Sequence, residues 1–198
     1  MKISQILSAR RHTVSFEIFP PKRGMVLDRA KETIEKIAAT KPAFMSVTYG
    51  AGGGSTGVNT CELSSHVQNV CGVPALAHLT CITSTREMIA EELKAFRRAG
   101  IENILCLRGD FPPDFAGEKS SGGFSHAIDL IKELRPSGFC LGGACYPECH
   151  PECEHIGEDI AHVVFRLSGE LSDVVGNKHG VCTSFYVSLN LDSFILIL

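Results

Sequence analysis

The sequence predicts an α/β fold of the (β/α)8 TIM-barrel type, incomplete, with about five to six βα units present. Two observations support this prediction. Segments rich in β-branched and aromatic residues alternate with amphipathic helical segments at roughly 30 residues per unit, as in a parallel sheet with crossover helices. Polar side chains also follow every expected strand, and in a barrel all strand ends meet on one face. An open doubly wound sheet stays the alternative, because there only the ends near the switch point converge.

The first half of the chain supplies three strands and two helices. Residues 13–19 (TVSFEIF) are β-branched and aromatic, and two prolines end them. Residues 26–39 carry apolar side chains at helical spacing. Further strands are expected at 44–49 and 75–82, with a more weakly patterned helix between them at 58–71.

The clearest helix signal comes after the third strand. Ser84 and Glu87 have the spacing of a capping box, and Gly100 is expected at the C-terminal cap. The remaining elements continue the same alternation: a strand at 102–107, a Pro- and Gly-rich loop at 111–123, a helix near 125–135, a strand at 139–145 and the start of a helix at 156–166.

Length and composition limit the prediction. A complete barrel has about 250 residues, whereas this chain has 198. Charged residues become rare near the C-terminus, and the chain finishes with the apolar run FILIL, which is either a buried strand or prone to aggregation. We therefore expect a barrel portion at 1–162 and a divergent tail at 163–198 that cannot be assigned.

The charge balance and the N-terminus exclude several classes of partner. The formal net charge of −3 gives no electrostatic reason to expect nucleic acid or an anionic membrane surface. The N-terminal apolar run is too short for a secretory signal, and no run approaches the roughly 20 apolar residues of a membrane helix. The odd number of cysteines, 9, is read as reduced thiols, so a cytoplasmic location is expected.

Two segments resemble known binding motifs, and each has a simpler interpretation as a loop. The first is a glycine run. The glycine run 52–57 matches G-x-G-x-x-G after a strand, but the next strand ends in His78, Thr80 and Cys81 without the acidic residue of a dinucleotide site. A flexible loop near the active face is the better interpretation. No sequence of the P-loop type is present.

A cluster at 145–155 (CYPECHPECEH) resembles a metal site only in composition. Cys145, Cys149 and Cys153 have C-x3-C-x3-C spacing with His150 and His155 nearby, whereas structural zinc sites commonly use C-x2-C pairs. We therefore expect no metal site, and interpret the cluster as a βα loop.

Three polar residues at strand ends are candidate functional groups. Glu17 lies within an apolar strand, where burial should raise its pKa and suit it to general acid work. The plainer alternative is a barrel-rim carboxylate paired with an Arg or Lys side chain. Asp110 comes after Arg108 and Gly109; the glycine would let the backbone approach a ligand, and the alternative is an Arg108–Asp110 ion pair in the loop. His78 is either a ligand contact or a satisfied core imidazole.

Five segments, taken together and in this order, resemble the catalytic domain of the 5,10-methylenetetrahydrofolate reductase family. They are VSFEIFPPK (14–22), FMSVTYGAGG (44–53), AHLTCI (77–82), NILCLRGDFPP (103–113) and YPECHPE (146–152). The resemblance implies a flavin-holding (β/α)8 barrel. It implies reduction of methylenetetrahydrofolate to 5-methyltetrahydrofolate, with FAD as cofactor, NADH or NADPH as hydride donor, a folate substrate, and a homo-oligomer in the intact family member.

The resemblance also implies roles for individual residues. Glu17 matches the general acid that helps to open the folate ring, and Asp110 matches the acidic residue beside the flavin and pterin; both would contact substrate. Arg108 suits the FAD pyrophosphate. The positions that match cofactor contacts are Thr48, Tyr49, His78, Leu107, Arg108, Gly109, Asp110, His126, Ala127, Tyr146, His150, Asp159 and Arg166.

The resemblance ends after about residue 162. The family's basic helix, its sixth strand and a folate-binding Gln cannot be placed in the tail, and the last two or three barrel strands are not found. We therefore expect a truncated or altered chain with impaired activity, and the alternative is an inactive fragment of the same family that binds flavin or a partner.

Overall fold

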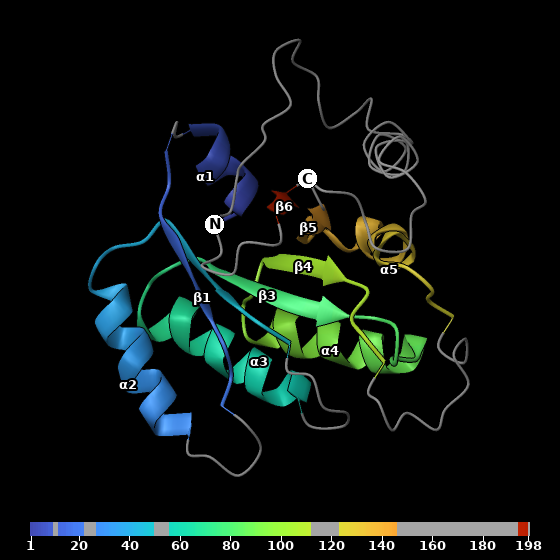
Figure 1. Cartoon of the computed structure of the whole chain (residues 1–198), viewed down its shortest axis with the longest axis horizontal. Coiled ribbons are helices and arrows are strands. Elements are labelled where there is room, and N and C mark those ends of the chain that lie inside the picture. The colour runs from blue at the N-terminus through green and yellow to red at the C-terminus, as the bar shows by residue number, and fades with distance from the viewer. Residues whose placement is uncertain (10–11, 22–26, 50–55, 112–122, 146–193, 198) are drawn as a thin grey trace.

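A six-stranded sheet lies at the centre of the protein, which we describe from a computed structural model covering residues 1–9, 12–21, 27–49, 56–111, 123–145 and 194–197. The strands succeed one another across the sheet in sequence order (Figure 1). Five neighbouring strands pair in parallel and the sixth pairs antiparallel with the fifth: β1 Ser15–Ile18, β2 Phe44–Val47, β3 Ala75–Thr80, β4 Asn103–Leu107, β5 Cys140–Cys145 and β6 Phe194–Ile197.

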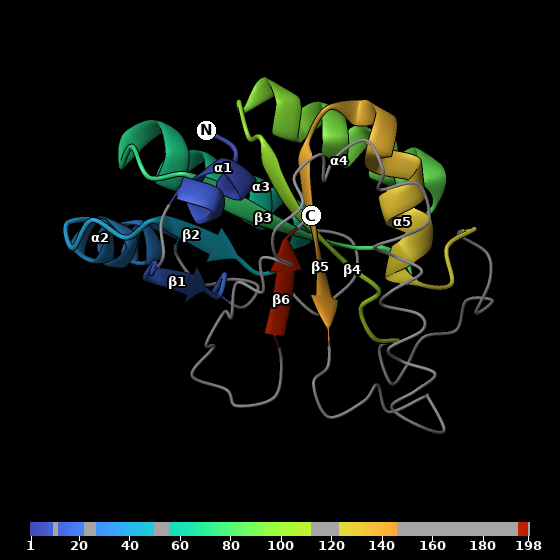
Figure 2. The same ribbon diagram turned by 90° about the horizontal axis from the view of Figure 1, so that it is seen from above.

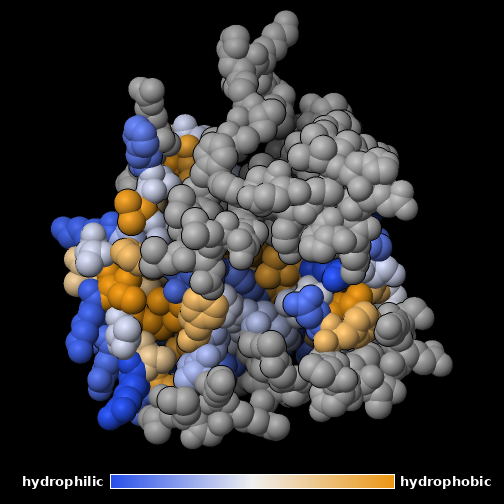
Figure 3. All heavy atoms as spheres, in the orientation of Figure 1, coloured by the Kyte–Doolittle hydropathy of each residue, from blue (hydrophilic) through white to orange (hydrophobic). Residues whose placement is uncertain are grey.

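The parallel α/β arrangement is thus confirmed for five strands. The apolar C-terminal run also contains a strand, but β6 runs antiparallel to its neighbour, as no strand of a (β/α)8 barrel does. β1 pairs with β2 and with no other described strand. Beside this edge, Val14 and Phe19 are exposed, and Figure 3 shows apolar side chains on the face where β1 lies.

Helices cover the two faces of the sheet unequally (Figures 1 and 2). One face packs against four helices, and the other carries a short N-terminal helix that the sequence patterns did not predict. The helices are α1 Ile3–Ala9, α2 Leu27–Ala38, α3 Thr56–Ser65, α4 Arg86–Arg98 and α5 Ala127–Leu134, with a π-helical turn His66–Val70 after α3 and a 3-10 turn Arg135–Ser137 after α5. Among the described residues, no helix has the length and apolar character needed to cross a membrane.

Alternation along the strands sends residues to opposite sides. Ala77, Leu79, Ile104 and Cys106 belong to the core under α4 and α5. Their neighbours in the strands point the other way, to what we call the inner face, opposite α2–α5. Near the N-terminal ends of the strands this inner face is apolar and packs against α1; its core residues are Ile3, Ile6, Ala43, Phe44, Leu76 and Leu105.

Asn103, at the start of β4, fixes α1 on the inner face. Its side chain is fully buried. Its Oδ1 accepts from the backbone N–H of Ile3 at 2.8 Å, and its Nδ2 donates to the carbonyls of Ala75 at 3.0 Å and Met1 at 3.2 Å. A buried amide with these partners ties three chain segments together.

The predicted capping box at the start of α4 is wrong by one residue. Thr85 is the N-cap, and its hydroxyl accepts from the backbone N–H of Met88 at 3.3 Å. Ser84 is instead buried and donates to the carbonyl of Thr80 at 3.2 Å, because the turn out of β3 directs it inward. Gly100 lies just after the C-cap residue with φ +70°, as the expected left-handed cap requires.

Candidate active site

Three polar side chains from neighbouring strands meet on the inner face. Glu17 on β1 pairs in register with Ser46 on β2, so both point to the same side. Ser46 pairs with Leu76 on β3, and His78 lies two residues further along that strand. All three therefore lie toward the C-terminal ends of their strands, whereas the apolar contacts with α1 lie at the other end. We call Glu17, Ser46 and His78 the inner-face triad.

The triad is compact and largely shielded from solvent. The hydroxyl of Ser46 donates to Oε2 of Glu17 at 3.5 Å, and Nε2 of His78 lies 3.6 Å from the same oxygen. Ser46 is fully buried, and the side chains of His78 and Glu17 are 6% and 17% exposed. Of the three groups, only the carboxyl keeps substantial access to a molecule arriving at the strand ends.

Burial shifts the pKa values of the two titratable members of the triad, Glu17 and His78. It raises the pKa of the Glu17 carboxyl, and the hydrogen bond from Ser46 lowers that pKa in part. The raised pKa expected from the apolar strand is therefore confirmed. Burial also lowers the pKa of His78 to about 4, so its imidazole is neutral near pH 7. Nε2 of His78 has no hydrogen-bond partner in the described part of the chain. The triad thus combines a carboxyl poised to hold a proton with a neutral imidazole.

Gly109 lies after β4 at a point where a side chain would not fit. Its φ of +77° lies in the left-handed region, and a Cβ there would be 2.9 Å from Cβ of Thr80. The close approach that glycine permits is therefore to a neighbouring strand end. The backbone N–H of Ile82 also donates to the carbonyl of Arg108 at 2.9 Å. These contacts fix the exit of β4 beside the exit of β3.

Asp110 is not in contact with the triad. Its side chain is 98% exposed, and Oδ1 lies 3.9 Å from a guanidinium nitrogen of Arg108. This long ion pair is the loop arrangement that the sequence left open as the alternative. Arg108 is partly buried and also donates from Nε to the carbonyl of Gly109 at 3.3 Å.

The two candidate residues that follow β2, Thr48 and Tyr49, lie on different sides of the sheet. The backbone N–H of Thr48 donates to the carbonyl of Ile18 at 2.9 Å, and its own carbonyl accepts from the hydroxyl of Thr60 at 3.0 Å. Thr48 therefore continues the strand pairing next to the triad. Tyr49 instead packs against the core under α4 and α5, on the opposite side from Glu17.

The remaining described candidates lie around the strand ends. Leu107 packs with the inner-face core beside α1. His126 and Ala127 form the start of α5, where the Asp129 carboxylate accepts from the backbone N–H groups of Ser125 and His126, each at 3.0 Å. The thiol of Cys81 contacts the carbonyl of His126 at 3.6 Å, which holds this helix start near β3.

Other expected residues lie outside the described part of the chain. These are Tyr146, His150, Asp159 and Arg166 among the cofactor positions, the glycines at 52–54, and Cys149, Cys153 and His155 of the cysteine-rich loop. Among the residues that are described, no group of three or more His, Cys, Asp or Glu could hold a metal ion.

Sequence reasoning missed Ser46. The signal that could have found it is alternation: in FMSVT, the residues at 46 and 48 share one face, and a serine inside a buried strand needs a polar neighbour. Glu17 is that neighbour, but only the register between β1 and β2 reveals it.

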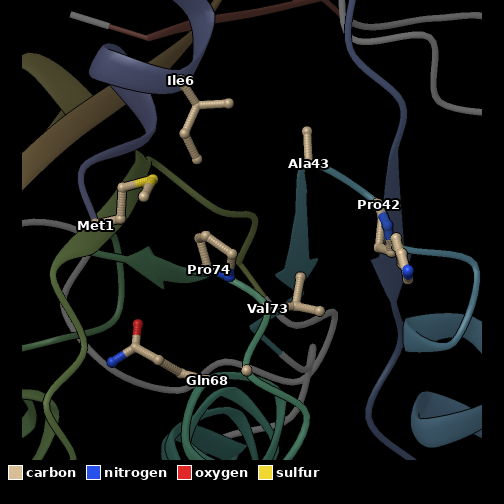
Figure 4. A pocket seen from close by; sticks show the side chains of 9 residues that line it. Met1, Ile6, Pro42, Ala43, Gln68, Val73 and Pro74 are labelled. Carbon is tan, nitrogen blue, oxygen red and sulfur yellow. The ribbon is translucent and has the colours of Figure 1, made fainter.

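A pocket of about 480 Å³ lies at the other end of the strands (Figure 4). It is bordered by residues that precede β2 and β3 and by the N-terminal segment: Met1, Ile6, Lys41, Pro42, Ala43, Gln68, Gly72, Val73 and Pro74. In barrel-type folds the N-terminal ends of the strands serve stability, while chemistry takes place at the C-terminal ends. We therefore take the triad, rather than this pocket, as the candidate active site.

Comparison with known proteins shows which family the chain belongs to. The family model for methylenetetrahydrofolate reductase matches residues 2–169. Similar proteins include methylenetetrahydrofolate reductase (NADH) 1 of Arabidopsis thaliana, 37% identical over 74% of this chain and 25% of that protein. The 5,10-methylenetetrahydrofolate reductase of Pectobacterium carotovorum is 36% identical over 70% of this chain and 45% of that protein.

The similarity extends over most of the chain in a second bacterial relative. The 5,10-methylenetetrahydrofolate reductase of Buchnera aphidicola is 31% identical over 91% of this chain and 57% of that protein. The chain thus spans about a quarter of the plant relatives and about half of the bacterial ones. Because the family model matches residues 2–169, well over half of the chain, the chain belongs to the methylenetetrahydrofolate reductase family.

Proposed function

We propose that the chain forms the flavin-binding part of an enzyme that reduces 5,10-methylenetetrahydrofolate to 5-methyltetrahydrofolate with NADH or NADPH as the hydride donor. Family membership supports the reaction class. The observation that carries the proposal is the buried carboxyl of Glu17, whose pKa is raised at the C-terminal end of a parallel strand. A carboxyl that stays protonated closer to neutral pH is the group that a general acid requires.

Glu17 has a defined task in this proposal. Its carboxyl donates a proton to a nitrogen of the bridged folate ring, so that the ring opens and its one-carbon group becomes electrophilic. The Ser46 hydroxyl holds the carboxyl at the strand ends by donating to Oε2, and Nε2 of His78 lies 3.6 Å from the same oxygen. FAD, when bound, supplies the transfer of hydride from the nicotinamide donor to the folate.

The described residues fit FAD in three respects. The partly buried guanidinium of Arg108 suits the pyrophosphate. Nε2 of His78 is a buried polar atom without a described partner, which a cofactor atom can satisfy. The tight exit at Gly109 brings backbone close to the strand ends. We further propose Thr48, Tyr49, Leu107, His126 and Ala127, with Tyr146, His150, Asp159 and Arg166, as cofactor positions.

Asp110 is proposed to act beside the flavin and pterin. Its carboxylate is exposed, and among the described residues its ion pair is the long contact with Arg108, so it can turn toward a ligand that covers the strand ends. A negative charge there would disfavour extra negative charge on a reduced cofactor and accept hydrogen bonds from pterin N–H groups.

Two activities test the proposal. Purified chain supplied with FAD is assayed for NADH and NADPH oxidation with menadione as acceptor, and separately with methylenetetrahydrofolate. Activity in both assays supports the proposal. Activity with menadione alone would support flavin reduction by the chain and contradict folate reduction, whereas flavin binding without turnover in either assay would favour the alternative of an inactive fragment that binds flavin or a partner. Absence of flavin binding under all conditions would contradict the proposal and leave only a fragment that binds a partner.

Location and assembly are part of the same proposal. Five cysteines of the described residues are free thiols, namely Cys61, Cys71, Cys81, Cys106 and Cys140. This state agrees with a reducing compartment, and we propose the cytoplasm. We also propose self-association into a homo-oligomer, which analytical ultracentrifugation at several concentrations measures directly.

A further inference from the structure

The two oxygens of the Glu17 carboxyl have different surroundings. The Ser46 hydroxyl and Nε2 of His78 both approach Oε2, at 3.5 and 3.6 Å. Oε1 makes no hydrogen bond to any described residue. Catalytic hydrogen bonds are often long before a ligand binds and shorten in the complex. The asymmetry therefore marks Oε2 as the held oxygen and Oε1 as the available one.

We propose that Ser46 is a positioning residue of the active site: its hydroxyl donates to Oε2 of Glu17, so that Oε1 carries the proton that is exchanged with a bound molecule. The inference rests on the proposed function for the identity of that molecule. The assignment of the two oxygens does not depend on which molecule binds.

The proton step is balanced by this arrangement. The Oε1–H bond breaks, and its electron pair stays on the carboxylate. The proton forms a new bond with the lone pair of the acceptor nitrogen. The hydrogen bond that Ser46 donates then stabilises the negative charge shared by both oxygens. Such a hydrogen bond becomes stronger when the carboxyl ionises.

The position of Ser46 in the sheet explains why it can do this. β2 lies between β1 and β3, and Ser46 is directly opposite Glu17 in the register. A serine side chain is short, so Glu17 and His78 can meet above it from the flanking strands. Ser64 on α3 provides a contrast: it is equally buried, but its hydroxyl has no partner among the described residues.

Other charged groups do not account for the raised pKa of the Glu17 carboxyl. β2 brings Ser46 but no titratable side chain to the carboxyl, and β3 brings His78, which is neutral near pH 7. Beyond β4, Arg108 and Asp110 face each other. Within the described part of the chain, burial and the Ser46 hydroxyl are the influences on this carboxyl.

The test is a titration of the Glu17 carboxyl itself. The full chain is labelled with [5-13C]glutamate, the Glu17 signal is assigned by its loss in Glu17→Gln, and its midpoint is measured in wild type, Ser46→Ala and Ser64→Ala. If Ser46 donates to Oε2, Ser46→Ala moves the midpoint to higher pH, because a donor that favours the ionised form is lost. Ser64→Ala should titrate as wild type does.

Other outcomes overturn the proposal. A midpoint that falls in Ser46→Ala would mean that Ser46 accepts the proton of Glu17, and an unchanged midpoint would mean that it does not hold the carboxyl. Ser46→Cys keeps the size of the side chain with a weaker donor; it should move the midpoint upward by less, and it replaces Ser46→Ala if circular dichroism shows that variant unfolded. The readout needs no turnover, so it remains decisive if the proposed reaction is not observed.

The infrared spectrum gives an independent check of the oxygen assignment. In the protonated acid, Oε2 is the carbonyl oxygen under the proposal, and it accepts from Ser46. Loss of that hydrogen bond in Ser46→Ala should shift the carbonyl stretch of 13C-labelled Glu17 to higher frequency. A stretch at the same frequency in wild type and Ser46→Ala would contradict the assignment.

Discussion

Oε2 of Glu17 lies 3.6 Å from Nε2 of His78, although β2 separates the two strands that carry these residues. The contact is possible because the residue between them on the inner face is Ser46, whose side chain is small and fully buried. A partly buried carboxyl and a buried imidazole thus face each other. Removing either side chain should therefore produce effects that depend on pH.

Replacing Glu17 should separate the two halves of the proposed reaction. Glu17→Gln keeps the size of the side chain but cannot donate a carboxylic proton, so folate reduction should fall by roughly a hundredfold to ten-thousandfold. Oxidation of NAD(P)H with menadione should stay near the wild-type rate. Stopped-flow measurement of each half-reaction checks this.

A matched control is Glu91→Gln, because Glu91 is exposed on α4 and pairs with Lys94. It should leave both half-reactions unchanged. Equal loss of the two half-reactions in Glu17→Gln would contradict the general acid role.

The buried carboxyl should also make folding stability depend on pH. Because the pKa of Glu17 is raised in the folded protein, the folded state binds this proton more tightly than the unfolded chain does. The resulting stabilisation is complete below the unfolded value of 4.5 and is lost as the pH rises through the folded pKa. Glu17→Gln should therefore become more stable relative to wild type as the pH rises. Urea denaturation across this range measures the difference, and a constant offset would refute the argument.

Much of the fold could be predicted from the sequence because it is local. The alternation in TVSFEIF, FMSVTY and ALAHLTCI marks strands, and helices α2 and α4 have continuous apolar stripes. The short α1 was not predicted, because seven residues give too little periodicity and its position depends on the distant Asn103. The cap at α4 was misplaced because Ser84 and Thr85 are chemically similar, and only the turn geometry selects between them.

The candidate site was harder to predict than the strands that form it. Glu17 and His78 stood out as polar residues in apolar segments. Ser46 did not, because its role depends on the register with β1, which no local pattern specifies. The antiparallel direction of β6 likewise depends on a pairing between segments distant in the sequence.

His78 should make the protein sensitive to acid. Burial lowers its pKa to about 4 from the ordinary value of 6.5, so the unfolded chain takes up a proton that the folded protein resists. Stability is fully present above pH 6.5 and is lost as the pH falls toward 4, by up to about 3 kcal/mol in total. His78→Gln should flatten this part of the stability profile. His12→Gln, at an exposed position, should leave the profile as in wild type; no flattening in His78→Gln would contradict the burial argument.

Asn103 should hold α1 on the sheet. Asn103→Ala removes three hydrogen bonds and leaves the buried N–H of Ile3 without its acceptor, at a cost of about 2 kcal/mol or more. Hydrogen exchange of the α1 amides should accelerate more than that of β3. The exposed Asn69→Ala, which also loses contacts to its neighbours, should change exchange near α4 without affecting α1. Unchanged protection of α1 in Asn103→Ala would show that the apolar contacts suffice.

Gly109 should tolerate no side chain, for two separable reasons. Its φ of +77° strains any L-residue, and a Cβ would also lie 2.9 Å from Cβ of Thr80. Gly138 has a similar φ of +83° but nothing within 4 Å of an added Cβ. Gly138→Ala should therefore show the backbone strain alone, about 1 kcal/mol in the free energy of unfolding. Gly109→Ala should lose more, because the exits of β3 and β4 must move apart. Urea denaturation of both variants gives the difference directly, and equal losses would mean that the strand ends yield to the extra methyl group without cost.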